Sequence, residues 1–286
     1  MKKGLSLLLF LGFLLLVQGS AALAENTKIT TLGQAVRAAW AISIQPVDAA
    51  PEDPASLPGI DVAQANGVAL DLALLVIDLD LARQKITYLQ AEQQQLQKQL
   101  VQAEKEIKMG KTKAETGEAL KKALAQNGFD LNYYRMQEEN GQKIFAKMTG
   151  AAIADGFQYE SAYLITDAGK LSLPAWAQQR PDAGELTKKM SAVLLVYGEL
   201  GAAVSAYIEA GEKLIAAQRD FKMGKVDQEG LETAAAVKEA VRIDALESKA
   251  GYAKILYELD CSLQGYISRD IKQVDDPIFL TGEGNP

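Results

Sequence analysis

A seven-residue apolar repeat runs through the longest helical stretch of the sequence, from about Asp61 to Met109. Two rows of residues recur with this spacing and lie beside each other on one helical face. The first row contains Leu75, Ala82, Leu89, Leu96 and Ala103, and the second contains Leu79, Ile86, Gln93, Leu100 and Ile107. Such a seam predicts one long helix that packs along a second helix, as in a left-handed coiled coil.

Three further long helices are predicted from apolar residues that stand three and four positions apart. They cover residues 113–149, 183–223 and 228–272, and a short amphipathic helix before them opens with a capping box from Thr31 to Gln34. Short turns between long helices favour antiparallel neighbours. We therefore expect an all-α fold of elongated antiparallel helical hairpins, arranged as two structural repeats, with little or no β structure.

Residues 151–181 interrupt the helical period. Apolar and polar residues alternate between Phe157 and Ile165, and the turn residues Asp167, Ala168 and Gly169 follow. Two structures fit this pattern: a short β-hairpin over residues 157–173, or irregular chain packed over the ends of the helices. The sequence leaves both open.

The tetrapeptide Lys-Met-Gly-Lys stands at the turn of each predicted hairpin, at residues 108–111 and again at residues 222–225. Glycine just past a helix end adopts the left-handed backbone conformation, and lysine suits the negative end of the helix dipole. Glu115 and Glu229 follow the two copies at the same distance. We predict an internal duplication with equivalent turns, a Thr112–Glu115 capping box after the first and an Asp227 N-cap after the second.

The first 24 residues have the features of a secretory signal peptide, with two lysines, an apolar run and the cleavage motif Ala22-Leu23-Ala24. We expect an exported protein, located in the periplasm or associated with the outer membrane. The predicted divisions of the chain are a signal peptide (1–24), a short helix with a proline-rich connector (25–59), a first hairpin repeat (60–150), the interrupting segment (151–181), a second hairpin repeat (182–272) and a flexible tail (273–286).

Composition removes several classes of function. The formal net charge of −7 argues against nucleic acid as the partner. The sequence has no histidine and a single cysteine, Cys261, so the commonest general base and metal ligand are missing and no internal disulfide can form. Asp71 and Asp78 share a helix face that could support a metal, although the polar edge of an amphipathic helix is the preferred interpretation. We predict that the protein is not an enzyme, and we assign no catalytic, cofactor-binding or metal-binding residue.

The order of these elements resembles the TolC-like outer membrane efflux proteins. The likeness rests on the opening residues 31–39, on the two Lys-Met-Gly-Lys turns, and on residues 253–259, which are similar to the Leu-Tyr-x-Leu-Gly ending of the family. Members of the family are duplicated helical hairpins that trimerise into a hollow cylinder. The resemblance implies a homotrimer and docking of a periplasmic adaptor and an inner-membrane pump at the hairpin tips. The implied partner-binding residues are Gly110, Lys111, Thr116, Gly224, Lys225 and Gly230.

The sequence departs from the family pattern in two respects. Thr116 and Gly230 stand where the family usually has an aspartate, and Lys111 and Lys225 follow the turn glycines in place of small or apolar residues. The family also carries strands for an outer-membrane barrel, whereas this chain has room for at most one hairpin. It therefore resembles a short, barrel-poor member of the family.

Two functions follow from the sequence. The first is a TolC-like conduit component, a helical periplasmic duct for the passive export of substrates that an inner-membrane pump delivers. The alternative is an exported coiled-coil scaffold or interaction protein without channel activity. The heptad pattern cannot distinguish them, because packing alone would produce the same pattern.

Overall fold

The computed structural model describes residues 29–43 and 61–270. The predicted signal peptide, most of the connector and the tail lie outside these ranges. Within them the regular structure is helical, and the only β feature is an isolated bridge between Ile29 and Ile153. The prediction of an all-α fold is confirmed for this part of the chain.

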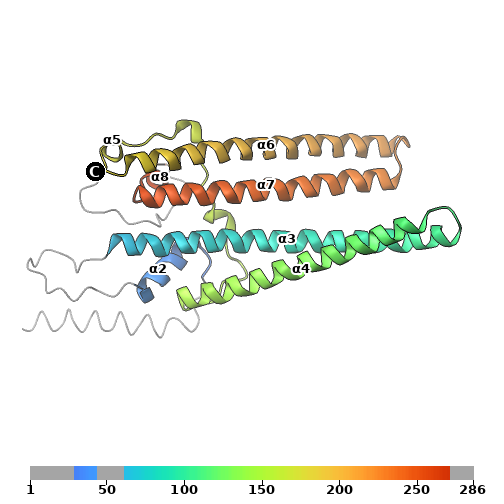
Figure 1. Cartoon of the computed structure of the whole chain (residues 1–286), viewed down its shortest axis with the longest axis horizontal. Helices are drawn as coiled ribbons and strands as arrows, with labels where there is room; N and C mark the ends of the chain where they lie inside the picture. Colours follow the sequence, from blue (N-terminus) through green and yellow to red (C-terminus); the bar gives the residue numbers. More distant parts are fainter. Residues whose placement is uncertain (1–28, 44–60, 271–286) are drawn as a thin grey trace, which may run out of the picture.

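Four long helices account for most of the fold (Figure 1). They are α3 (Val62–Lys108), α4 (Ala114–Thr149), α6 (Ala183–Lys222) and α7 (Gln228–Ser262). The shorter elements are α2 (Leu32–Ser43), η1 (Tyr159–Ala162), η2 (Ala168–Lys170), α5 (Ala175–Gln178) and α8 (Tyr266–Asp270).

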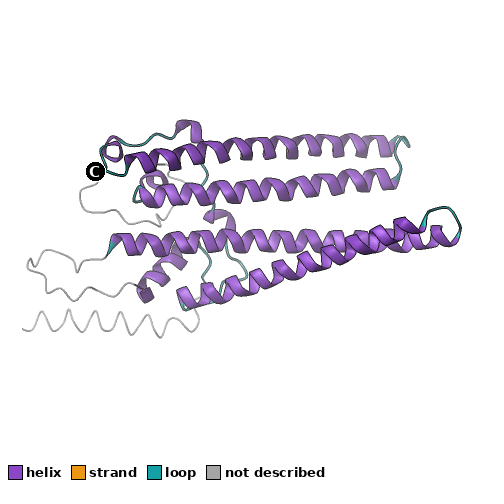
Figure 2. Ribbon diagram, viewed as in Figure 1, coloured by secondary structure: helices purple, strands orange, loops and turns teal. Residues whose placement is uncertain are grey.

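The long helices form one open layer in the order α4, α3, α7, α6. Each helix contacts only its neighbours in this order, so that α3 pairs with α4, α6 pairs with α7, and α3 meets α7 in the middle. Helices within a pair are antiparallel, and both hairpin turns lie at the same end of the molecule (Figure 2). We call this end the tip end and the opposite one the base. The layer therefore has two free edges, one formed by α4 and one by α6.

The predicted seam of α3 faces α4. Leu79, Ala82, Leu89 and Ala103 are buried, and the other seam residues are partly buried. Glycines of α4 permit the close approach: a Cβ on Gly141 would lie 2.7 Å from the Leu79 Cδ2 atom, and a Cβ on Gly117 would lie 3.1 Å from the Ile107 Cδ1 atom. The pairing of the two helices thus depends on positions where α4 lacks a side chain.

The main apolar core lies at the base. It uses a second face of α3, which includes Leu72, Ala73 and Val76, and it is completed by residues of α2, α4, α6 and α7. The indole Nε1 of Trp40 in α2 donates a hydrogen bond of 2.8 Å to the carbonyl of Ala65 in α3. Leu72 continues the second heptad row toward the base, whereas Ala73 and Val76 stand one position beyond the rows, so the heptad rows did not predict this second face.

The interrupting segment is irregular chain with short 3-10 turns, so the β-hairpin alternative is not realised. Two hydrogen bonds attach the segment to the layer. The Tyr163 hydroxyl donates to Asp80 of α3 at 2.8 Å, and the Tyr252 hydroxyl of α7 donates to the carbonyl of Thr166 at 2.6 Å. The segment packs against α3 and α6. Alternating side chains had suggested strands, but these hydroxyl and apolar contacts hold the chain over the helices instead.

The predicted single helix over 228–272 is interrupted, because α7 ends at Ser262 and a separate helix, α8, covers Tyr266–Asp270. The chain turns after α7 through Gln264 and Gly265, which both have positive φ. The carboxylate of Asp260 accepts hydrogen bonds from the backbone N–H groups of Ile267 (2.7 Å) and Ser268 (3.2 Å). A buried acid that satisfies these donors stabilises a separate short helix, α8, in place of a continuous one.

The capping predictions had mixed outcomes. Asp227 caps α7 as predicted, because its side chain accepts from the N–H of Gly230 at 2.9 Å. The Thr31 hydroxyl accepts from the N–H of Gln34, but the Gln34 side chain accepts from Thr30, so only half of that box forms. The Thr112 box is wrong and is described with the tips below.

Candidate interaction surfaces at the tips and edges

The two hairpin turns have the same backbone structure. Gly110 and Gly224 adopt left-handed conformations with φ of 70° and 69°. The N–H of Lys111 donates to the carbonyl of Glu106, and the N–H of Lys225 donates to the carbonyl of Asp220, both at 2.9 Å. Together with a bond from each glycine N–H, this is the Schellman arrangement, which satisfies the last carbonyls of the helix. The left-handed conformation predicted for the two glycines is confirmed.

The first turn lacks the predicted capping box. Lys113 occupies the N-cap position of α4 and makes no side-chain cap hydrogen bond. The Thr112 hydroxyl instead donates to the Glu106 carboxylate at 3.0 Å, and the Gln102 amide donates to the same carboxylate at 2.6 Å. The hydrogen bond from Gln102, then the one from Thr112, and the charge of Lys111 hold the pKa of Glu106 below its ordinary value. The Thr112 hydroxyl therefore contacts the end of α3 and does not cap α4. Residue spacing alone could not predict this contact.

The remaining predicted tip residues occupy different environments. Thr116 is exposed on α4, and its N–H donates to the carbonyl of Lys113 at 3.1 Å. Gly230 is partly buried, and a Cβ there would lie 2.5 Å from the Val226 Cγ1 atom. Gly110, Lys111 and Thr116 thus belong to one tip and Gly224, Lys225 and Gly230 to the other. The structure puts both groups at one end of the layer without joining them, since α4 contacts neither α6 nor α7.

The outermost residues of both tips combine positive charge with exposed apolar side chains. Residues 107–114 and 221–226 contain five lysines and no carboxylate. The five lysines are exposed: Lys108, Lys111, Lys113, Lys222 and Lys225. Met109 and Met223 stand between them with 57% and 51% of their surface exposed. The turns themselves are thus basic, and carboxylates stand directly beside them at Glu106, Glu115, Asp220 and Asp227.

The free edge of α4 carries an apolar stripe that sequence analysis missed. Phe129, Tyr133, Met136 and Ile144 stand at intervals of four, three and eight residues, which places them on one helical face. They are exposed, with Phe129 at 70% and Met136 at 63%. We call these residues the α4 stripe. Aromatic and methionine side chains gathered on an exposed surface indicate an interaction site.

Exposed residues of α6, the other edge helix, form a second stripe beside its buried row: Leu194, Gly201, Ile208 and Ile215, at seven-residue intervals. All four are exposed. We call them the α6 stripe. An 18-residue window of α6 is apolar enough in composition to cross a membrane, and only 11% of that window is buried. A window of α3 passes the same test, but it contributes to the core at the base.

Contacts across the layer place the two stripes at similar positions between the base and the tip end. Glu138 of α4 pairs with Arg83 of α3 at 2.7 Å, and Lys85, half a turn further along α3, pairs with Glu247 of α7. Little more than one turn along α7, the Tyr252 ring packs on Tyr197 of α6 with 5.4 Å between ring centroids. Glu138 and Tyr197 therefore lie within about two helical turns of one another along the layer. Each lies inside the range of its own stripe.

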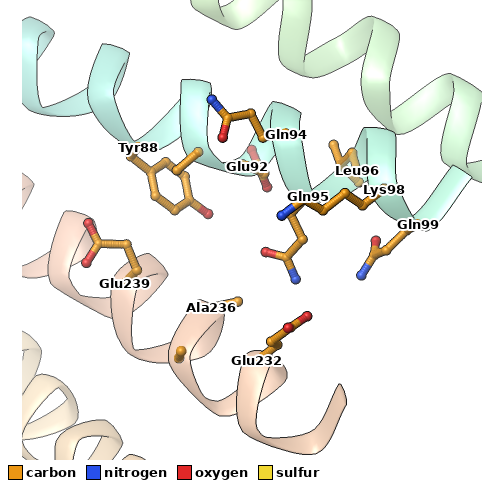
Figure 3. A pocket seen from close by; sticks show the side chains of 12 residues that line it. Tyr88, Glu92, Gln94, Gln95, Leu96, Lys98, Gln99, Glu232, Ala236 and Glu239 are labelled. Atoms are coloured by element: carbon orange, nitrogen blue, oxygen red, sulfur yellow. The ribbon is translucent and has the colours of Figure 1, made fainter. Parts of the chain in front are cut away.

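A groove opens where the two hairpins separate toward the tips (Figure 3). It lies between α3 and α7 and has a volume of about 510 Å³. Its lining includes the carboxylates Glu92, Glu232 and Glu239, together with Tyr88. Burial raises the pKa of Tyr88, and the negative charges of Glu92, Asp244 and Glu239 raise it further.

The part of the chain that the structure describes contains no group of three or more metal-binding side chains. The three aspartates of the apolar stretch have other roles: Asp78 pairs with Lys254 at 2.5 Å, Asp80 accepts from Tyr163, and Asp71 is exposed. Comparison with known proteins found no match among family models, curated proteins or solved structures. The functional argument therefore rests on the geometry of this chain.

Proposed function

We propose that this protein is a subunit of a TolC-like conduit, in which copies join edge to edge and close into an α-helical duct. The observation that carries the proposal is the open layer with an uncovered apolar stripe on each free edge. Monomeric proteins rarely expose an apolar surface of this kind, and burying it against a partner stabilises the assembly. The tip residues named above would then face a periplasmic adaptor or an inner-membrane pump.

The two edges are complementary in shape. The α4 stripe presents large side chains, whereas α6 has Gly198 and Gly201 on its exposed surface, where a Cβ would meet nothing within 4 Å. Glycine inside an exposed helix costs about 1 kcal/mol relative to alanine, so open space around it suggests that another helix approaches there. Large side chains of α4 from one copy would fill the hollow of α6 on the next.

Contact between two different edges produces a particular kind of assembly. A head-to-tail contact leaves one free edge at each end of a chain of copies, and it ends only when the chain closes into a ring. We propose a homotrimer, located in the periplasm or at the outer membrane. Substrates would pass through its water-filled centre without chemical change, consistent with a protein to which we assign no catalytic residue.

The solution mass of residues 25–286, purified without detergent and measured by light scattering, tests the ring. A stable trimer with a central hole in electron micrographs is the expected result. A monomer or an isologous dimer would overturn the conduit and leave the exported coiled-coil scaffold.

Disulfide trapping tests which surfaces meet. In a Cys261→Ser background, Met136→Cys and Ser205→Cys are combined in one chain and oxidised. The expected product is a closed, covalently linked ring. Efficient dimerisation of the Met136→Cys variant alone would show that α4 meets α4, and would rule out the head-to-tail arrangement.

A further inference from the structure

We propose that the two hairpin tips form a docking element for an anionic phospholipid surface. The inference concerns the same tips as the proposed function. It rests on the proposed function in one respect only, the direction in which the tips face. It assigns the lysines and methionines of the tips a lipid contact, beside the protein partners named in the proposed function.

Four of the five tip lysines form no ion pair. Among the described residues, no ion pair is formed by Lys108, Lys113, Lys222 or Lys225, whereas some lysines along the helices pair with glutamates, as Lys143 does with Glu139 and Lys213 with Glu209. Glu106, which stands beside the first tip, accepts hydrogen bonds from Gln102 and Thr112. The lysine ammonium groups are therefore available to an external anion.

The apolar residues between the lysines suit the interface of a bilayer. Met109, Phe221 and Met223 are exposed at the end of the molecule, each within a few residues of two lysines. In interfacial membrane binding, lysines contact the lipid headgroups and neighbouring apolar side chains enter the boundary of the acyl chains. Neither tip uses its methionine to stabilise the turn, since the Schellman hydrogen bonds involve only the backbone.

The shape of the tip end favours a bilayer over a folded protein. The tips are two separate convex turns, and the tip of the first hairpin extends beyond that of the second (Figure 1). A rigid protein surface would need a matching step, whereas a fluid bilayer adapts to both turns. The repeated Lys-Met-Gly-Lys sequence is also expected here, because a bilayer presents the same chemistry to each tip.

Vesicle co-sedimentation tests the inference on residues 25–286. We expect binding to vesicles of phosphatidylcholine and phosphatidylglycerol in equal parts, and no binding to phosphatidylcholine alone. Each lysine near an anionic surface contributes about a fivefold change in partition. The combined variant Lys108→Gln, Lys111→Gln, Lys222→Gln and Lys225→Gln should therefore lose binding. Raising the salt from about 0.1 M to about 0.5 M should weaken the wild type.

A control variant tests whether vesicle binding depends on the position of the lysines or only on the net charge of the protein. The variant with Lys143, Lys147, Lys188 and Lys213 each replaced by Gln has the same net charge, and it should bind as the wild type does. Equal loss of vesicle binding in both variants would overturn the inference. Failure of the wild type to bind anionic vesicles would also overturn it, and is the result expected if the tips bind an acidic protein.

Fluorescence distinguishes tip-first from side-on binding. An environment-sensitive probe is attached to Met109→Cys or to Ile208→Cys, each in a Cys261→Ser background. Anionic vesicles should shift the emission of the probe at position 109 to the blue and leave the probe at 208 unchanged. The reverse result would show that the α6 stripe binds lipid, and the tip proposal would fail.

The solution mass of the same variants keeps the two proposals apart. Tip variants that still assemble but no longer bind vesicles support the lipid contact. A protein that binds anionic vesicles through its tips as a monomer would contradict the conduit and leave the lipid contact intact.

Discussion

Leu79 of α3 occupies the space that a side chain at Gly141 of α4 would need. A Cβ on Gly141 would lie 2.7 Å from the Cδ2 atom and 3.1 Å from the Cγ atom of Leu79, whose side chain is buried. The two helices of the first hairpin can therefore approach closely at the point where they enter the core. This contact fixes the position of α4 relative to α3, and with it the direction of the α4 stripe.

Gly141→Leu should lower the free energy of unfolding by about 1 to 3 kcal/mol, because the added side chain overpacks the crossing. Urea denaturation followed by circular dichroism measures the change. Gly128→Leu on the same helix is the control, since a Cβ at Gly128 meets nothing within 4 Å. Adding Leu79→Ala to Gly141→Leu should recover part of the loss, and strict additivity of the two substitutions would contradict the proposed contact.

Gly110→Ala and Gly224→Ala should each destabilise the protein by about 1 kcal/mol, because alanine is strained in the left-handed conformation. Gly128→Ala, in the interior of α4, should have the opposite sign and stabilise by about 0.5 to 1 kcal/mol. Chemical denaturation of the three variants gives the comparison. A neutral effect at one turn and a large effect at the other would show that the turns are not equivalent.

Asn127→Asp should destabilise the first hairpin by about 2 kcal/mol at neutral pH. The Asn127 side chain is only 4% exposed, and its Nδ2 donates to the Leu89 carbonyl at 3.1 Å and to the Glu92 carboxylate at 2.8 Å. A carboxylate there would repel both acceptors. Burial and the Glu92 carboxylate keep the new acid protonated in the folded state at a higher pH than in the unfolded chain, so the loss should shrink as the pH falls toward about 4. Asn132→Asp, on the exposed side of α4, adds the same charge and should have little effect at any pH.

The stability of the protein should fall above about pH 10. Burial, the charge of Asp80 and the hydrogen bond to Asp80 raise the pKa of Tyr163 well above its ordinary value. The folded state then retains a proton that the unfolded state releases, so stability present below pH 10 is lost as the pH rises further.

Tyr163→Phe isolates this contribution. The variant should lose about 1.5 to 3 kcal/mol near pH 8, the amount expected for a hydrogen bond to a charged group. Above pH 10 its difference from the wild type should narrow by about 1.4 kcal/mol per pH unit. Tyr133→Phe removes an exposed hydroxyl on α4 and serves as the control. A constant difference between wild type and Tyr163→Phe across this range would contradict the assignment.

Met136→Lys should weaken self-association at least about tenfold, because it introduces an unpaired charge into the proposed edge contact. The helix itself should be unaffected, since Met136 is exposed in a single copy. Light scattering over a range of concentrations measures the association. Gln142→Lys adds the same charge to α4 outside the stripe and should assemble as the wild type does. Equal behaviour of the two variants would count against the edge contact.

Much of the helical framework follows from local chemistry. Asp61 caps α3 with bonds to the N–H groups of Ala63 and Gln64, and the glycines of the two Lys-Met-Gly-Lys turns end α3 and α6 where the sequence predicted. These features depend on interactions within a few residues, so the sequence is sufficient to predict them. The alternation near Tyr159 left the hairpin and the irregular chain undecided, because local periodicity does not report what lies across the fold.

The sequence by itself determined the long helices, their antiparallel pairing and the repeated turns, because heptads, caps and glycines act over one or two helical turns. Only the tertiary structure decided that α3 meets α7 through contacts such as Lys254 with Asp78, which are far apart in the chain. That meeting makes the molecule an open layer, and it leaves the faces of Phe129 and Ile208 uncovered. An exposed apolar residue and a buried one have the same pattern in the sequence, and only the arrangement of neighbouring helices distinguishes them.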